Sequence, residues 1–310
     1  MRIRVDAWDP GYVTPGDETA QQSKAKVDAG VEIPVASWAP IDAVAEPRLR
    51  TVLLVDGVRR LDAHLWLTPD DNGEAKPGIC ASYAAGVVRC TPGDGATLVA
   101  AQVMHGLFTS VADVPSMTAH GGAVYVSHPV TGGETADLVN AVQAQLRGLE
   151  ISVTAKANAI DEELLIVDGP LHGRAHIARA LGYVKSHRVQ YLPGELGRLV
   201  NSLEAGQRTP VFALDTSWAR YSWYLRLPGA DVPAAGLVRL EASADLPLDD
   251  VVALANAASA ALPRLASSPY KDPRAPQNLT PIAGLERRLR TLLGDQRLLQ
   301  RGLRAAASRN

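Results

Sequence analysis

Short apolar runs that end at Asp-Gly are the clearest pattern in the chain. Residues 164–167 are too few for a helix, are rich in β-branched side chains and are closed by Asp168-Gly169, which is typical of a buried central strand. Residues 52–55 are closed in the same way by Asp56-Gly57. A strand covered on both faces has no polar alternation. The pattern therefore predicts two buried strands, each ending in an aspartate.

The segments between these runs predict a meander followed by a helix. Residues 61–68 alternate apolar and polar, which indicates a half-buried antiparallel strand, and residues 79–90 predict another strand. Farther along, a helix is expected to begin at Thr135 and to pack on the sheet, because apolar residues recur at helical spacing. These residues are Leu138, Val142, Leu146, Leu149 and Val153. Glu150 falls about 80° from the centre of that face, so it is either a side chain that reaches a strand end or an ordinary boundary glutamate.

The remaining segments predict a chain of alternating elements. The N-terminal residues predict a short strand at 2–8 and a polar arm, in which residues 31–38 dock as an edge strand because they contain Pro34. An irregular loop is expected at 267–278, before a terminal helix that begins near Pro281. The other expected elements are a strand or loop at 182–187 and 189–192, helices at 195–203 and 248–262, and strands at 211–214, 223–227 and 237–242.

Composition bounds the class of protein. The 310 residues, 46% of them hydrophobic, can bury one large core or two modest ones. No apolar run approaches the roughly 20 residues that span a bilayer, and the N-terminus lacks the apolar stretch of a signal peptide, so we expect a cytoplasmic protein with no membrane partner. Cys80 and Cys90 are too few for a four-thiolate site and are expected to be small core residues.

Charge and missing motifs narrow the function classes. A net charge of −2 exerts no global attraction on nucleic acid, so such a partner must be held by local basic features. The sequence contains no GxxxxGK[ST], GxGxxG after a strand, HExxH or GxSxG. It therefore gives no support to P-loop nucleotide hydrolysis, Rossmann redox chemistry, zincin proteolysis or serine hydrolysis at a nucleophile elbow.

The two Asp-Gly aspartates suggest a site for a divalent cation. Side chains that do chemistry in open α/β sheets gather outside the strand ends, so Asp56 and Asp168 are expected close together. At about 4 Å and an effective dielectric of roughly 20, two carboxylates repel by about 4 kcal/mol. Mg²⁺ or Mn²⁺ relieves that repulsion and accepts carboxylate ligands. The alternative is that Asp-Gly is a common turn dipeptide and that each aspartate is structural.

The order of these features resembles the NurA family of DNA-end-processing nucleases over roughly residues 50–295. The features are the strand ending in Asp56-Gly57, the meander, the helix carrying 146–150, the strand ending in Asp168-Gly169, then Gly182-Tyr-Val-Lys185 and a closing segment at Tyr270. The resemblance implies an α/β fold: an RNase H-like mixed sheet with flanking helices. It also implies an N-terminal arm at 1–48, a nuclease domain at 49–284 and a basic C-terminal helix at 285–310.

The same resemblance implies an activity, a cofactor and partners. The protein is expected to be a Mn²⁺- or Mg²⁺-dependent deoxyribonuclease, a 5′–3′ exonuclease and single-strand endonuclease that processes DNA ends as a homodimer with a HerA-type hexameric ATPase. By position, Asp56, Glu150 and Asp168 are the metal ligands and catalytic residues, with Lys185 as a further catalytic residue. The family places a histidine on its last helix, whereas no histidine follows His187 here, and Asp272, Gln277 or Asn278 are the candidates to replace it. The alternative function is a non-catalytic DNA-binding or adaptor subunit of the same complex.

Basic and aromatic side chains are the candidates for DNA contacts. They are Lys185, Arg59, Arg60, Tyr270, Arg287 and Arg288. From 285 to 310 the chain carries seven arginines against Glu286 and Asp295, a local charge of +5. Gly294 and Gly302 weaken a helix, so the part after Gly294 is expected to be free and to order on DNA or on the ATPase. The alternative is an ordinary solvated helix face.

Overall fold

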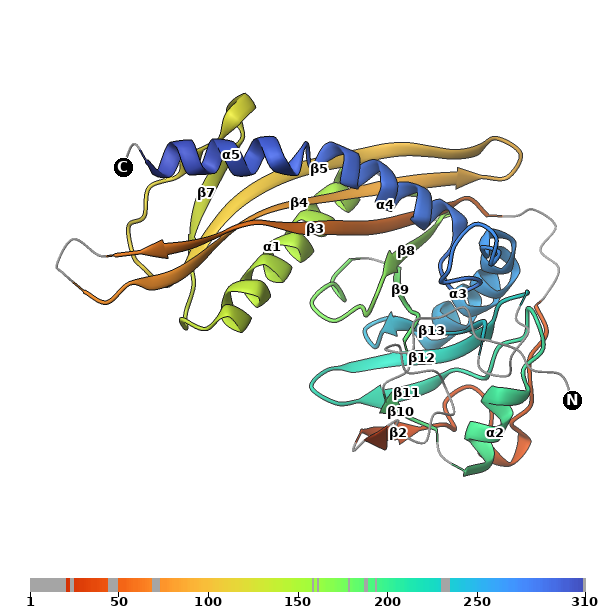
Figure 1. The fold of residues 1–310 in the computed structure, drawn as a ribbon. Helices are drawn as coiled ribbons and strands as arrows, with labels where there is room; N and C mark the ends of the chain where they lie inside the picture. Colours follow the sequence, from red (N-terminus) through yellow and green to blue (C-terminus); the bar gives the residue numbers. More distant parts are fainter. Residues whose placement is uncertain are drawn as a thin grey trace, which may run out of the picture. The chain divides into compact units, whose positions relative to one another are not determined.

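A computed structural model describes residues 21–22, 25–43, 50–68, 73–157, 159–160, 162–177, 179–186, 189–192, 194–229 and 235–308. The protein is mixed α/β (Figure 1). It divides into two compact units: unit 1 comprises Met1–Leu54, Val88–Thr97 and Ala159–Ala283, and unit 2 comprises Val55–Val87, Leu98–Asn158 and Gly284–Asn310. The strand predicted at 2–8 lies outside the described residues.

Within the described residues, the main sheet has eleven strands in the order β2-β11-β12-β13-β9-β8-β3-β4-β5-β7-β6. Its neighbours are both parallel, as in β8 with β9, and antiparallel, as in β9 with β13. The predicted mixed sheet is therefore confirmed. The strands are β2 (Lys26–Asp28), β3 (Val52–Leu67), β4 (Lys76–Thr91), β5 (Gly95–Thr109), β6 (Met117–Thr118), β7 (Val124–Pro129), β8 (Leu164–Asp168), β9 (Ala180–Val184), β11 (Phe212–Asp215), β12 (Ala219–Arg226) and β13 (Leu237–Ser243). A separate parallel pair joins β1 (Gln21–Gln22) to β10 (Val189–Gln190).

In unit 1 most predicted elements are present, and the predicted edge strand is wrong. Helices α2 (Gly194–Ser202) and α3 (Leu248–Ala261) and strands β8, β11, β12 and β13 lie where the apolar pattern places them. Residues 31–38 do not form a strand; they contain the 3-10 helix η1 (Val35–Ser37), which starts after Pro34 at a φ of −52°. The fixed φ of proline suits the start of a helical turn. The edge strand is instead β2, which pairs with β11.

In unit 2 strand β3 runs through Asp56-Gly57 without ending, so the predicted break at this dipeptide is wrong. A Cβ on Gly57 would lie 2.7 Å from Leu146 and 2.7 Å from Glu150, so the glycine serves a close approach of strand and helix. Gly169 in unit 1 has a φ of +94°, which does favour glycine, and there strand β8 ends as predicted. The same dipeptide therefore has two different structural roles.

Helix α1 (Thr135–Lys156) buries all five of the apolar residues that predict its inner face. It covers one face of β3, because it contacts Gly57. The Arg60 guanidinium, three residues along the strand, donates to the Leu293 and Gly294 carbonyls at the end of α4 (Thr280–Leu292). Side chains an odd number of residues apart point to opposite faces of a strand. Within unit 2, α1 and the end of α4 therefore lie on opposite faces of β3.

The predicted C-terminal helix is two helices, and the second belongs to the core. Gly294, with a φ of +78°, separates α4 from α5 (Gln296–Ala307), and the two helices run on in tandem (Figure 1). The Asp295 carboxylate caps α5 by accepting from the Leu298 amide at 2.9 Å. The inner face of α5 packs with Cys80, Leu107, Met117 and Tyr125 through Leu299, Leu303 and Ala306. The expectation that residues after Gly294 are free is therefore wrong.

Both cysteines are buried and free, as expected of small core residues. Among the helices that the structure describes, none combines the length and apolar content that crossing a bilayer requires. Helices α1, α3 and α5 each bury an inner face.

Candidate functional site

In unit 1, Asp168 and Lys185 meet at the ends of two parallel strands. Asp168 lies opposite Tyr183 in the register of β8 with β9, and Lys185 follows the last residue of β9. The Lys185 ammonium lies 2.6 Å from Asp168 Oδ2 and donates to Asn278 Oδ1 at 2.8 Å. The side chains of Lys185 and Asp168 are only 13% and 15% exposed. The sequence places these two residues on neighbouring segments, and the structure pairs them.

The polar network continues into the loop that precedes α4. The Asn278 side-chain amide donates to Asp272 Oδ2 at 2.7 Å, and Asp272 Oδ1 accepts from the Arg274 amide at 2.7 Å. Burial alone would raise the pKa of Asp272, but the hydrogen bonds from Asn278 and Arg274 lower it, so the carboxylate stays ionised. Both of its oxygens accept hydrogen bonds within unit 1. Asp272 and Asn278 thus hold the loop against Lys185.

The loop is anchored a second time by Tyr183, whose hydroxyl donates to the Gln277 carbonyl at 2.7 Å. Burial, and then the charge of Asp168, raise the pKa of Tyr183 well above its ordinary value, so the phenol remains a donor. Gln277 contributes its main-chain oxygen here. Asp272, Gln277 and Asn278, the three candidates to replace a histidine, all lie in this loop. The contacts described for them fix the conformation of the loop.

A cavity of about 250 Å³ lies beside the Asp168–Lys185 pair in unit 1. Its wall includes Asp168, Tyr183, Lys185, Ser186 and Arg274. Each cation of the wall has an acidic partner, Lys185 with Asp168 at 2.6 Å and Arg274 with Asp272 at 3.5 Å. Lys and Arg are also the side chains that bind phosphate oxygens.

In unit 2, Asp56 lies close to an acid that the sequence reasoning did not select. Glu286 projects from α4, and carboxylate oxygens of Asp56 and Glu286 lie within 4.8 Å of one another, in an arrangement that could hold a metal ion. Asp56 is 8% exposed, and its Oδ1 accepts from the Gly57 amide at 2.7 Å. The Glu286 side chain is 13% exposed and lies 3.9 Å from the Arg290 guanidinium. Two carboxylates so close in a partly buried place are suited to a hard divalent cation.

A signal for Glu286 does exist in the sequence. It follows Leu285 and precedes Leu289 on α4, and both leucines are buried. A glutamate next to the apolar face of a helix stands out, since charged residues are rarely buried unless paired or bound to a metal.

Glu150 lies on the other side of β3 from the Asp56 side chain. It is 4% exposed, and its Oε1 would be 2.7 Å from a Cβ on Gly57. Because neighbouring residues of a strand point to opposite faces, Asp56 and Gly57 face different sides. The structure therefore brings Glu150 to the Asp56-Gly57 backbone, but Glu286 to the Asp56 carboxylate.

The predicted DNA contacts separate into exposed and structural residues. Arg60 donates to Asp62 Oδ1 at 2.7 Å and to the Gly294 carbonyl at 2.9 Å, so it fixes the end of α4. Arg59 is exposed on β3, and Tyr270 is 96% exposed in a loop of unit 1.

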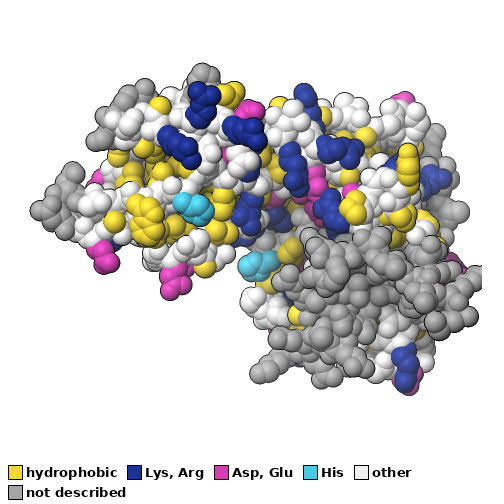
Figure 2. Space-filling model, viewed as in Figure 1, with side chains coloured by type: hydrophobic (Ala, Val, Ile, Leu, Met, Phe, Trp, Pro, Cys, Tyr) yellow, Lys and Arg dark blue, Asp and Glu magenta, His cyan; other side chains and the backbone are white. Residues whose placement is uncertain are grey.

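Figure 2 shows Lys and Arg side chains gathered over the face along which α4 and α5 run. We call the exposed arginines of these helices the α4–α5 basic surface: Arg287, Arg288, Arg290, Arg297, Arg301 and Arg304.

One further buried acid is structural. Glu241 on β13 accepts hydrogen bonds from Arg239 at 2.6 Å and from Arg220 at 2.9 Å, and its other oxygen accepts from the Leu171 amide at 3.0 Å. Burial alone would raise its pKa, but Arg239, the Leu171 amide and Arg220 lower it. Its charge is fully paired, so Glu241 belongs to the interior of unit 1.

No protein-family model matches the chain, and a search of the curated proteins gave no match either.

Proposed function

We propose that the protein is a Mn²⁺- or Mg²⁺-dependent deoxyribonuclease with an RNase H-like fold, similar to the NurA nucleases. The observation that carries this proposal is the approach of the Asp56 and Glu286 carboxylates to within 4.8 Å at a partly buried position. Both residues are proposed as metal ligands. Asp168 is proposed as a further ligand on the sequence argument alone, and Glu150 as a residue that positions β3 against α1.

The proposed chemistry divides between the cation and the side chains. When bound, the cation would activate a water and stabilise the leaving oxygen of a phosphodiester. Asp56 and Glu286 would hold it, and their mutual repulsion, which disfavours the empty state, favours binding. Lys185 and Arg274 would hold a phosphate oxygen in the cavity of unit 1, where both line the wall.

DNA is proposed to bind the α4–α5 basic surface. Glu286 is followed directly by Arg287 and Arg288, so an acid proposed to hold the metal and exposed cations lie on consecutive residues of one helix. Cations that neutralise backbone phosphates supply sequence-independent affinity. A HerA-type hexameric ATPase and a second copy of the chain are proposed as protein partners on the resemblance alone.

The second candidate is a non-catalytic DNA-binding or adaptor subunit. The pairing of Asp168 with Lys185 at 2.6 Å favours it, because this carboxylate already has a counter-charge. No histidine follows His187 in the sequence, so the family's histidine on the last helix is missing as well. In this case the α4–α5 basic surface binds DNA, and the protein does not cleave it.

Digestion of end-labelled DNA with Mn²⁺, with Mg²⁺ and with EDTA tests the proposal, with and without the ATPase. Asp56→Asn and Glu286→Gln should each abolish cleavage, whereas Glu150→Gln should retain most of it. Glu195→Gln is the matched control, because Glu195 is exposed on α2 and pairs with Arg198. DNA binding by the wild type without cleavage under any metal condition would establish the second candidate instead.

A further inference from the structure

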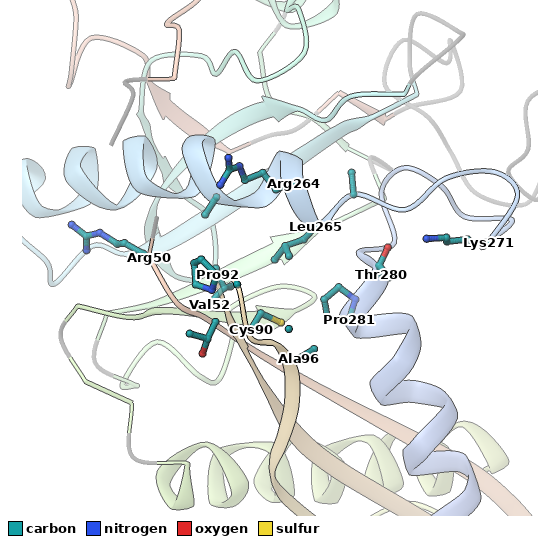
Figure 3. Close-up of a pocket in the computed structure, with 15 residues that line it drawn as sticks. Arg50, Val52, Cys90, Pro92, Ala96, Arg264, Leu265, Lys271, Thr280 and Pro281 are labelled. Atoms are coloured by element: carbon teal, nitrogen blue, oxygen red, sulfur yellow. The ribbon is translucent and has the colours of Figure 1, made fainter. Parts of the chain in front are cut away.

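Unit 1 contains a second and larger cavity, of about 540 Å³ (Figure 3). It lies between the start of β3, the turn that joins β4 to β5, the end of α3 and the first residues of α4. Its volume is within the range of roughly 300–1,000 Å³ that is usual for small-molecule sites. It shares no lining residue with the cavity beside Asp168.

The wall of this cavity is positively charged. It contains Arg50, Arg264 and Lys271, and none of its lining residues is acidic. Among the residues that the structure describes, neither the Arg264 nor the Lys271 side chain has a hydrogen-bond or ion-pair partner. Arg264 and Lys271 are therefore the two cations of the wall with which an anionic ligand could pair.

The charged groups lie on two sides of an apolar floor. Figure 3 shows Arg50 and Arg264 on one side and Lys271 with Thr280 on the other, with Val52 and Cys90 between them. Burial raises the pKa of the Cys90 thiol to about 11, so it remains neutral and is part of the apolar floor. A ligand that fits this wall therefore has an anionic group joined to a flat or apolar body.

The start of α4 strengthens the anionic end of the site. Thr280 and Pro281 are its first two residues and both line the cavity. A helix N-terminus carries partial positive charge. The Thr280 hydroxyl can donate to the same anion as Lys271. On the other side, the planar guanidinium of Arg264 can stack on a flat ring.

We propose that this cavity binds a free nucleotide, with its phosphate between Lys271 and Thr280 and its base over the apolar floor beside Arg264. The site uses neither Asp56 nor Glu286, so it stands independently of the proposed nuclease activity. Each part of a nucleotide suits one part of the cavity. The phosphate suits the cationic end, and the base suits the apolar floor and the Arg264 guanidinium.

Isothermal titration calorimetry on the full chain in EDTA tests this assignment, with AMP, UMP, adenosine and inorganic phosphate as probes. AMP or UMP should bind more tightly than adenosine and than inorganic phosphate. Lys271→Ala should weaken AMP binding about tenfold and leave adenosine binding unchanged, because only the phosphate contact is lost. Arg264→Ala should weaken both AMP and adenosine. Arg198→Ala removes an exposed arginine of α2 and should change neither.

Three outcomes would overturn the assignment. The first is an absence of heat with AMP and UMP at millimolar concentration. The second is AMP binding that survives in the Arg264→Ala/Lys271→Ala double variant, since that places the nucleotide elsewhere. The third is a 5′-phosphorylated oligonucleotide that displaces AMP and binds far more tightly, which would make the cavity a site for a strand end. Asp56→Asn should bind AMP as the wild type does, so failure here and failure of the nuclease are distinguishable.

Discussion

The ammonium of Lys185 lies 2.6 Å from the carboxylate of Asp168, at the ends of two parallel strands of unit 1. The two aspartates that look equivalent in the sequence therefore have different neighbours within their own units. Asp168 faces a cation, whereas the Asp56 carboxylate in unit 2 lies within 4.8 Å of the carboxylate of Glu286. Loss of the negative charge should have opposite effects on stability at the two positions.

Asp168→Asn should lower the free energy of unfolding of the metal-free protein by about 1–3 kcal/mol, because it leaves Lys185 without its charged partner. Asp56→Asn should leave it unchanged or raise it, because repulsion from Glu286 is relieved. Urea denaturation in EDTA measures the free energy of unfolding of both variants. Equal and large losses for the two variants would mean that both aspartates are structural.

Gly57→Ala should destabilise unit 2 by about 1–3 kcal/mol, because the added methyl would lie 2.7 Å from both Leu146 and Glu150. Gly148→Ala on α1 is the matched control. A Cβ there meets nothing within 4 Å, so this change should stabilise the helix by roughly 0.5–1 kcal/mol. Thermal unfolding of the two variants checks the signs. A neutral Gly57→Ala would show that the strand and α1 are not packed this closely.

Leu303→Ala should lower the free energy of unfolding by about 2–4 kcal/mol, because Leu303 is 1% exposed in the core of unit 2. Leu298→Ala, on the same helix but 46% exposed, should change it by less than about 0.5 kcal/mol. For the same reason, deletion of residues 296–310 should impair folding. A truncated protein as stable as the full chain would show that α5 is dispensable to the core.

Glu241→Gln should destabilise the protein at pH 7 by about 3–5 kcal/mol, because Arg239 and Arg220 keep their buried charges and lose their partner. The pKa of Glu241 is lowered from its ordinary value of 4.5 in the folded protein. The stabilisation that the ionised Glu241 carboxylate contributes is therefore complete above pH 4.5. It is lost as the pH falls through the pKa of Glu241 in the folded protein. Denaturation curves between pH 7 and 3 should show the variant and the wild type converging. A constant difference across this range would contradict the assigned charge pairing.

The local apolar pattern predicted most elements because their burial depends on their own spacing. Helix α1 is the clearest case, since the five residues that predict its inner face are all buried. The role of Asp56-Gly57 could not be predicted from its own segment, because Gly57 makes room for Leu146 and Glu150, about ninety residues away in the chain. Local composition does not distinguish a glycine that turns from one that makes room for a helix.

The acidic partner of Asp56 was missed for a related reason. In the sequence, Glu286 is one charge in a basic helix, whereas its position beside Asp56 comes from the packing of α4 in unit 2. The C-terminal arginines also concealed the apolar face formed by Leu299, Leu303 and Ala306, which face Cys80 and Tyr125. Their spacing of 4 and 3 was visible, but the partner surface on β4, β5 and β7 was not.

The chain passes between the two units five times, at 54/55, 87/88, 97/98, 158/159 and 283/284. Strands β3, β4 and β5 and helix α4 all contain one of these crossing points. Neither unit can therefore be expressed as one uninterrupted fragment, and a polypeptide that stops at Ala283 would lose most of α4. Co-expressed fragments of this protein should therefore recover its structure only by associating with one another. A fragment kept apart from the rest of the chain should not fold.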